Sequence, residues 1–335
     1  MKAIVQDTYG TGEVLQFGEI DTPEIGDRDV LVRVVAAGVN PADWAIMAGL
    51  PYVARPVYGL PRPKTRVRGS DVAGIVEATG PAVTRFKPGD EVFGSGVGSF
   101  SEFAAAPEDA LVLKPATLAF EQAASVAMAG QVAVLALIRH GKVGPGQKVL
   151  INGASGGIGT FAVQIAKALG AHVTGVASTR NQELVRSLGA DEVIDYSKDD
   201  FTASGVQYDF ILDNVSNHSL SKLRRALTPT GMLVPNGGNF GNRWFAGGGR
   251  VMRAVILSLF VGQTLRTFIQ ATELENLVVL KELIEAGKVS PVIDTVYPLA
   301  GASRALEHVG AGHARGKVVI AVAAQPAGAL IAAAA

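Results

Sequence analysis

The stretch KVLINGASGGIG, residues 148–159, decides the fold of this chain. Its short apolar run stops at a glycine-rich turn. Residues 161–169 then show helical spacing, with Gly170 placed to end the helix, and a second apolar run follows over 172–177. Strand, glycine turn, helix and strand in this order predict the first half of a dinucleotide-binding fold.

The glycine turn predicts a pyrophosphate site. Gly156 leaves the backbone free to approach the phosphates, and Gly159 lets the helix pack close to the strand. The helix N-terminus offers free N–H groups and the positive end of a dipole. A structural turn without a ligand is the alternative, which the flanking strand and helix disfavour. Cofactor binding is therefore assigned to the whole turn: Ala154, which replaces the usual first glycine, Ser155, Gly156, Gly157, Ile158 and Gly159.

The end of the second apolar run indicates which dinucleotide binds. An NAD site usually has an acidic residue about 20 positions after the glycines. Residues 177–181 read ASTRN and contain no acid. Ser178 and Thr179 are small donors, and Arg180 can pair with a 2′-phosphate. These residues predict NADP(H) rather than NAD(H); the alternative is that Arg180 is a solvated residue at a helix start.

Length and composition exclude several classes of protein. A chain of 335 residues predicts two domains. Lys+Arg and Asp+Glu both total 30, so no basic surface for nucleic acid is expected. Cysteine is absent, which excludes disulfides, a thiolate nucleophile and cysteine-ligated zinc. The first six residues show no signal peptide, and we expect a cytoplasmic protein.

Two apolar stretches resemble membrane segments without meeting their requirements. Residues 251–261 are too few to span a bilayer and include Arg253, and their spacing suits a buried or interface helix. Residues 318–335 are interrupted by Gln325 and Pro326. We interpret 318–322 as a closing strand and the rest as a loose tail, so no stable membrane insertion is expected.

The pattern of apolar runs divides the chain. Runs at 30–37, 72–78 and 91–93 predict a β-rich N-terminal domain. From about residue 120, longer helices alternate with buried strands, among them 208–213 and 231–234, as in a parallel sheet.

The C-terminal part changes character again. A helix is predicted over 273–286, closed by Gly287, and a second one over 302–309 before the closing strand. This late return to strands predicts that the C-terminus rejoins the first domain.

Several motifs together give the chain a family resemblance. They are GVNPAD at 38–43, GSDVAG at 69–74, FKPGDEV at 86–92, SFSEF at 99–103, the glycine turn, and GHARGKV at 312–318. The chain resembles the zinc-free quinone oxidoreductase branch of the medium-chain dehydrogenase/reductase superfamily. The resemblance implies an α/β fold, with a GroES-like β-rich domain over 1–122 and 272–335. It also implies a Rossmann domain with a doubly wound parallel sheet over 123–271, and an active site in the cleft between the two domains.

The same resemblance implies that no catalytic zinc is held. The positions of the family's zinc ligands have Asn40, Ser70 and Met128. An amide, a hydroxyl and a thioether are poor zinc ligands. The four-cysteine structural zinc loop is missing as well, and the five histidines show no metal spacing.

Without a metal, reduction of an isolated ketone lacks strong alkoxide stabilisation. A quinone or an α,β-unsaturated carbonyl (an enone) needs less, because the charge spreads into a hydroquinone or an enolate. NADPH-dependent hydride transfer to such a small-molecule substrate is therefore favoured. Two alternatives stay open: a zinc-independent NADP-dependent alcohol or aldehyde oxidoreductase, and an NADPH-binding redox sensor with little turnover.

The resemblance assigns candidate catalytic residues. Asn40 would contact the nicotinamide ribose, or serve only its turn. Tyr52 would donate a hydrogen bond or proton to the substrate oxygen, or be an ordinary loop tyrosine. Asp43 would orient its neighbours, or cap a helix.

The resemblance also assigns further cofactor contacts: Tyr196 near the adenosine phosphate, Asn214 and Val215 after one strand, Gly237 after the next, and Lys317 close to the C-terminus. Val132 stands where relatives have a threonine near the nicotinamide. Either Gln131 replaces that hydrogen bond, or the nicotinamide is held more loosely. A homodimer, formed through the Rossmann sheet edge or through 251–261, is a further expectation.

Overall fold

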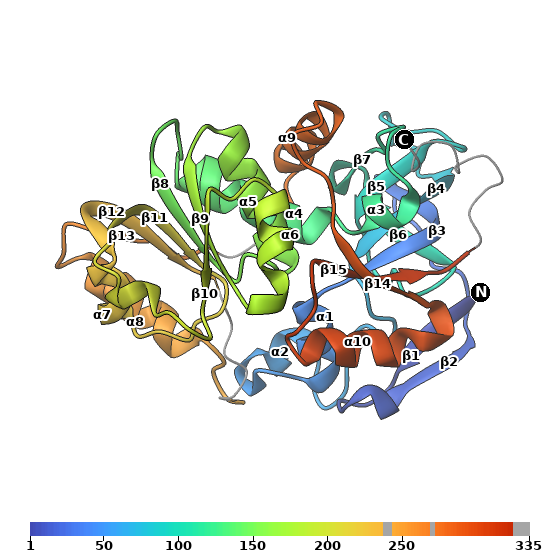
Figure 1. The fold of residues 1–335 in the computed structure, drawn as a ribbon. Helices are drawn as coiled ribbons and strands as arrows, with labels where there is room; N and C mark the ends of the chain where they lie inside the picture. Colours follow the sequence, from blue (N-terminus) through green and yellow to red (C-terminus); the bar gives the residue numbers. More distant parts are fainter. Residues whose placement is uncertain (237–242, 269–271, 324–335) are drawn as a thin grey trace.

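A computed structural model describes residues 1–236, 243–268 and 272–323. The chain forms two lobes, each built around its own sheet (Figure 1). The first and last parts of the sequence share one lobe, and the middle part forms the other (Figure 1).

The middle of the chain forms a parallel sheet in the order β10-β9-β8-β11-β12-β13. Its strands are β8 (Lys148–Asn152), β9 (His172–Ala177), β10 (Glu192–Asp195), β11 (Tyr208–Asp213), β12 (Leu227–Pro235) and β13 (Thr264–Leu265). Val149 and Ile151 enter one buried cluster, while Leu150 between them enters another. Both faces of the sheet are therefore covered, as in a doubly wound fold.

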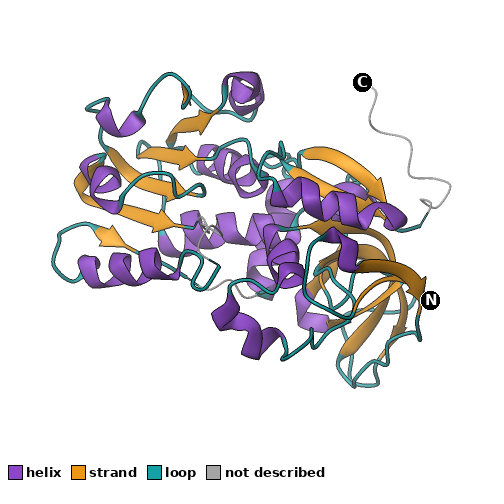
Figure 2. Ribbon diagram, turned by 90° about the horizontal axis from the view of Figure 1, so that it is seen from below, coloured by secondary structure: helices purple, strands orange, loops and turns teal. Residues whose placement is uncertain are grey.

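Helices cover the two faces of this parallel sheet (Figure 2). They are α4 (Ala127–Val134), which continues as a π-helix over Leu135–His140, α5 (Gly157–Ala168), α6 (Gln182–Ser187), α7 (Leu220–Arg225) and α8 (Gly248–Ser258). Helix α5 follows the glycine turn and stops before Gly170, whose φ of +80° is the left-handed conformation that ends a helix. The predicted strand–turn–helix–strand unit is confirmed.

The other lobe contains a sheet in the order β14-β15-β3-β4-β5-β7, with β6 also paired to β3. Its strands are β3 (Asp29–Val39), β4 (Asp71–Thr79), β5 (Glu91–Ser95), β6 (Phe103–Pro107), β7 (Leu111–Leu113), β14 (Ile293–Pro298) and β15 (Lys317–Ala321). A separate antiparallel pair joins β1 (Lys2–Gln6) to β2 (Leu15–Glu19). Because β15 pairs with β3, the C-terminal part does rejoin the first domain.

Helices and short turns complete this lobe and join it to the other. They are α1 (Pro41–Ala48), α2 (Arg55–Tyr58), α3 (Phe120–Ala124), α9 (Leu274–Glu285), α10 (Ala302–Gly310) and the 3₁₀ turn η2 (Tyr52–Ala54). Helix α9 packs on α4 and β7. One buried cluster includes Val35 and Phe93 of the first lobe together with Ala133 and Val149 of the second. The lobes therefore share a core.

The helix predicted over 251–261 exists as α8, but it is not buried in this chain. Only Ala254 of α8 is buried. Within the described residues, no helix is both long enough and apolar enough to cross a membrane. Gly237 and the Ala-rich tail lie outside the described residues.

Candidate cofactor and substrate site

The glycine turn has an open face at the start of α5. A side chain on Gly159 would place its Cβ 2.1 Å from the carbonyl oxygen of Gly153, so Gly159 is required by packing. A Cβ on Gly156 would meet only that oxygen, at 3.5 Å. Gly156 is also the N-cap of α5. The turn thus leaves space for a ligand beside free backbone N–H groups, which suits a pyrophosphate.

Two asparagine side chains near the turn carry unsatisfied polar atoms. Asn181 donates from Nδ2 to Ser155 Oγ at 3.1 Å, while its buried Oδ1 has no hydrogen-bond partner in the described structure. Asn214 accepts from Asn236 at 2.9 Å, and its buried Nδ2 likewise lacks a partner. Val215 lies against Gly153. Buried polar atoms normally have hydrogen-bond partners, so these two atoms fit a site where a bound ligand makes the missing hydrogen bonds.

An acidic residue missed by the sequence analysis lies at the end of β10. Asp195 accepts a hydrogen bond of 2.5 Å from the Thr179 hydroxyl and two more from Ser197. The bond from Thr179, followed by those from Ser197, lowers the pKa of Asp195 to about 2. Thr179 was predicted as a donor to the cofactor, but its proton is directed to Asp195. Asp195 was overlooked because it ends β10 rather than β9.

Other predicted cofactor residues surround the end of β9. Ser178 precedes the 3₁₀ turn that starts at Thr179. Arg180 donates from Nη2 to the carbonyl oxygen of His313 at 3.3 Å, which crosses from one lobe to the other. Tyr196 is 56% exposed and donates its backbone N–H to Ala177. Arg180 and Tyr196 are therefore both available to a ligand at this edge of the sheet.

Four polar side chains form a buried cluster in the first lobe. Asn40 donates from Nδ2 to Asp71 Oδ2 at 3.0 Å, and its backbone N–H donates to Asp43 Oδ2 at 2.8 Å. Lys317 Nζ donates to the carbonyl oxygen of Val39 at 3.0 Å and to Asn40 Oδ1. Asp43 thus has the capping role that was weighed as its alternative. Asn40, Asp43 and Lys317, predicted separately, lie together.

Burial governs the charges of this cluster. Burial, followed by the charge of Asp71, raises the pKa of Asp43 to about 7, against the lowering effects of Asn40, Lys317 and Arg68. Burial also lowers the pKa of Lys317, although Asp71 and Asp43 oppose that shift. The cluster therefore holds titratable groups in a poorly hydrated place.

Strand β15 joins this cluster to the glycine turn. The Gly316 N–H donates to the Ser155 carbonyl at 2.8 Å, and Gly156 and Gly316 form an isolated parallel bridge. The Lys317 Cδ would lie 3.2 Å from a Cβ on Gly157, so its side chain passes beside the turn. Residues predicted for cofactor and substrate therefore meet across the two lobes.

Sequence analysis also missed a set of unsatisfied donors beside the cluster. Arg68 is almost fully buried, and neither Nε nor Nη2 has a hydrogen-bond partner among the described residues. The hydroxyls of Ser70 and Ser99 also lack partners there, and Ser99 Oγ lies next to Gly69. Arg68 directly precedes the GSDVAG motif, and nothing in the sequence there signals that an arginine is buried, so only the fold could reveal this set.

Tyr52 lies between the lobes but has no described hydrogen bond to the buried cluster. Its ring makes an edge contact with Trp244 at 5.4 Å between centroids, and the guanidinium of Arg55 stacks on it at 4.7 Å. Its backbone N–H donates to the Arg243 carbonyl at 2.8 Å. Tyr52 thus lies where the two lobes touch, and its role as proton donor stays a prediction.

The region of Val132 is tightly packed. Val132 is 4% exposed, and Gln131 is fully buried, with Oε1 accepting from the Glu273 backbone at 2.9 Å. Gln131 therefore fixes the start of α9. Its Nε2 has no partner in the described structure, and whether it reaches a nicotinamide stays a prediction.

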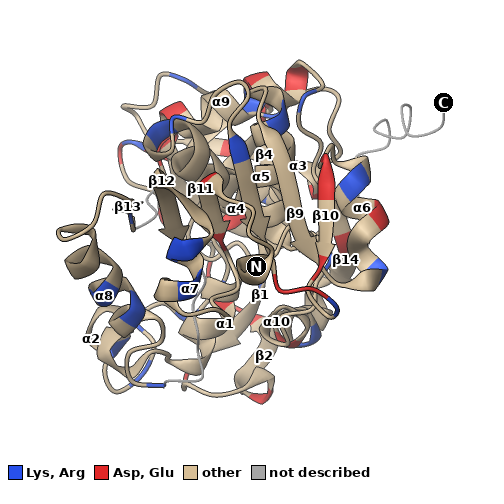
Figure 3. Cartoon of the chain, turned by 60° about the vertical axis from the view of Figure 1, so that its left-hand side comes forward, with Lys and Arg blue, Asp and Glu red and all other residues tan. Residues whose placement is uncertain are grey.

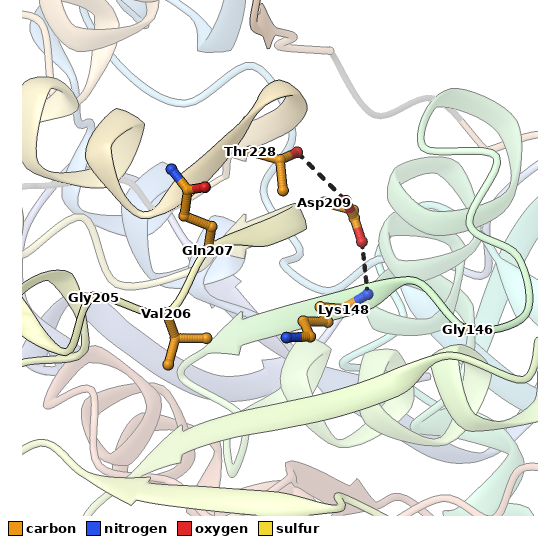
Figure 4. A pocket seen from close by; sticks show the side chains of 7 residues that line it. All are labelled: Gly146, Lys148, Gly205, Val206, Gln207, Asp209 and Thr228. Carbon is orange, nitrogen blue, oxygen red and sulfur yellow. Dashed lines mark hydrogen bonds between the residues drawn. The ribbon is translucent and has the colours of Figure 1, made fainter.

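A surface depression of about 470 Å³ lies at the amino ends of the central strands of the parallel sheet (Figure 4). Its lining includes Lys148, the first residue of β8, and Asp209, the second residue of β11. Ligands of doubly wound sheets bind at the carboxyl ends of the strands, where the glycine turn lies. The depression is therefore not the cofactor site.

Comparison with known proteins agrees with this geometry. The family described as alcohol dehydrogenase GroES-like domain matches residues 26–116, and the one described as zinc-binding dehydrogenase matches 188–320. The quinone-oxidoreductase QR1 of Triphysaria versicolor is 34% identical over 96% of this chain and 98% of its own length. The chain belongs to the quinone oxidoreductase-like branch of the medium-chain dehydrogenase/reductase superfamily.

Two further members of this superfamily are similar over most of the chain. A trans-enoyl reductase of Aspergillus terreus is 33% identical over 88% of this chain and 87% of its own. The quinone oxidoreductase of Escherichia coli, solved with NADPH, has a TM-score of 0.79 at 25% identity and covers 96% of this chain and 100% of its own.

The zinc of other superfamily members does not fit the residues present here. Asn40, Ser70 and Met128 surround Asp71, which accepts from the Met128 N–H at 3.1 Å. The Lys317 ammonium lies 3.6 Å from Asp71, so this carboxylate already faces a cation. In the described part of the chain, no group of three or more His, Asp or Glu residues could hold a metal ion. The donor set thus offers too few ligands.

Proposed function

We propose that this chain is an NADPH-dependent, zinc-independent oxidoreductase that reduces a quinone or an α,β-unsaturated carbonyl by hydride transfer. One observation carries the proposal. The place of the family's metal ligands is filled by the buried set Asn40, Asp71 and Lys317, and β15 ties that set to the glycine turn.

The glycine turn and its neighbours would hold the cofactor. Gly156 offers the open backbone, and Asn181 Oδ1 and Asn214 Nδ2 lack hydrogen-bond partners that a ligand could supply. Arg180 would pair with the 2′-phosphate. The NADPH bound to the Escherichia coli relative supports this choice. When bound, NADPH would supply the hydride; the protein's part is to orient it and to exclude water.

The residues of the first lobe would bind the substrate oxygen. Arg68 and the hydroxyls of Ser70 and Ser99 have donors left over, and such donors stabilise the charge that grows on an oxygen during reduction. A conjugated acceptor spreads that charge, so hydrogen bonds can replace a Lewis acid. The names of the quinone oxidoreductase and trans-enoyl reductase relatives support this class of substrate.

The test is NADPH consumption with 1,4-benzoquinone, a simple enone and a simple aldehyde, each with and without a chelator. Turnover of the quinone or enone that the chelator does not change, with no turnover of the aldehyde, is the expected result. Activity on the aldehyde alone would assign the chain to the carbonyl-reducing class. Tight NADPH binding without turnover of any of the three would favour a redox sensor.

A further inference from the structure

Helix α8 presents its apolar side to the solvent. Of its residues only Ala254 is buried, and six large apolar side chains at or just after the helix are exposed: Val251, Met252, Val255, Ile256, Leu259 and Phe260. Leu259 and Phe260 are 78% and 79% exposed. At 100° per residue, these six positions fill one continuous arc, with Arg253 at its edge. A surface helix normally turns such an arc toward the core, so this one needs a partner.

A second exposed apolar segment lies on the same side of the molecule. Trp244 and Phe245 precede α8 and are more than half exposed, as are Val57 and Leu60 beside α2. The backbone N–H of Val53 donates to Trp244, which holds the two segments together. Figure 3 shows α8 and α2 as neighbours. We call residues 51–68 and 243–260 together the α2–α8 face.

The charge of this face is one-sided. Its two segments contain eight Lys or Arg residues and no Asp or Glu, in a chain that has 30 of each kind. Arg66 and Arg250 pair with Asp7 and Asp213, and Arg68 is buried. Five cations remain for which the described structure shows no ion pair: Arg55, Arg62, Lys64, Arg243 and Arg253. The ribbon of α8 accordingly carries blue and no red in Figure 3.

We propose that the α2–α8 face docks peripherally on an anionic lipid bilayer. The apolar arc of α8, with Trp244 and Phe245, enters the interface, and Arg62, Lys64, Arg243 and Arg253 lie among the headgroups. Arg55 is instead held on the rings of Tyr9 and Tyr52. The helix has 11 residues, too few to span the bilayer, so it lies in the membrane plane.

Charge complementarity favours a lipid surface over a second copy of this chain. A twofold contact through this face would bring each face against its own copy. The cations of both copies would then oppose one another without any acidic residue of the face to offset them. An anionic bilayer offers both the apolar interior and the opposite charge. The proposal does not depend on the chemistry proposed above, because none of the residues of the α8 arc belongs to the cofactor or substrate site.

The experiment is co-sedimentation with vesicles of phosphatidylcholine, with and without about 30 mol% phosphatidylglycerol. The full chain is expected to sediment with the anionic vesicles and to do so less as salt rises. With neutral vesicles it should remain in the supernatant. Leu259→Ser with Phe260→Ser should weaken binding at least about tenfold, because two exposed apolar side chains no longer enter the interface. Arg62→Gln with Lys64→Gln should also weaken it about tenfold.

Phe17→Ser is the matched control. Phe17 is 51% exposed on β2, at the far end of the molecule in Figure 1, and its loss should leave vesicle binding unchanged. The thermal midpoint and NADPH binding of the α8 variant should equal those of the wild type, which excludes misfolding as the cause.

Three results would overturn the proposal. One is absence of binding to the anionic vesicles, and another is equal binding to neutral ones. The third is a wild-type dimer in light scattering that the α8 variant converts to a monomer, since a second copy would then cover this face. Loss of catalytic activity is not among these results, so the two proposals fail separately.

Discussion

Lys317 Nζ lies 3.6 Å from Asp71 Oδ2, and both side chains are almost fully excluded from solvent. The pair stands beside the glycine turn of the other lobe, although residues 71 and 317 are remote in sequence. Two opposite charges in such a place are stable only together, because either one alone would be buried without compensation.

Lys317→Met is therefore expected to lower the free energy of unfolding by about 3–5 kcal/mol, since the Asp71 carboxylate would lose its cation. Urea unfolding measures this change. Lys281→Met is the matched control, because it removes an exposed pair with Glu285 and should cost under about 0.5 kcal/mol. Equal losses in the two variants would show that the buried pair has no special role. Asp71→Asn in the Lys317→Met background should restore part of the stability.

The raised pKa of Asp43 predicts a pH-dependent stability. A carboxyl group that titrates near 7 in the folded state and near 3.8 when unfolded keeps its proton longer in the folded state. Its contribution to stability is complete below about pH 4 and is lost as the pH rises through 7, by at most about 1.4 kcal/mol per pH unit. Asp43→Asn, which can still accept the Asn40 N–H, should become more stable relative to the wild type over this window. Asp21→Asn, at an exposed position, controls for the loss of one charge; a parallel effect there would refute the assignment to Asp43.

Two glycines of the turn should respond differently to the same substitution. Gly156→Ala meets no close contact, so it should cost under about 1 kcal/mol of stability but weaken NADPH binding at least about tenfold, because the methyl group occupies the phosphate approach. Gly159→Ala would place its Cβ 2.1 Å from Gly153, so it should destabilise the fold itself. Thermal unfolding and NADPH fluorescence titration separate the two effects. Unchanged NADPH affinity in Gly156→Ala would remove the turn from the cofactor site.

Arg180 should determine the choice between the two cofactors. Arg180→Gln is expected to raise the KM for NADPH about tenfold and leave that for NADH unchanged, because only NADPH carries the 2′-phosphate. Arg186→Gln, a nearby exposed arginine whose Nη2 bonds to Gln182, is the control. An equal rise of both KM values in Arg180→Gln would contradict a specific phosphate contact.

Local patterns predicted the elements but not every contact among them. The glycine turn and the strands around it follow from spacing within 30 residues, and β15 was expected to return to the first domain. The cluster of Asn40, Asp71 and Lys317 depends on residues that only the tertiary fold brings together. Arg68 and Asn181 were missed because burial leaves no local signal for a polar residue. For α8, the spacing of apolar residues predicted a buried or interface helix. The sequence could not show which side of that helix would face the core.

The contacts that join the two lobes differ between the β15 side and the Tyr52 side. On one side, β15 is bound through Gly316 to the glycine turn and through Lys317 to the Asn40 loop. On the other side, Tyr52 and Val53 meet residues 243–244 through two backbone hydrogen bonds and one ring edge. The contacts between the lobes are therefore more deeply buried beside the glycine turn than beside Tyr52.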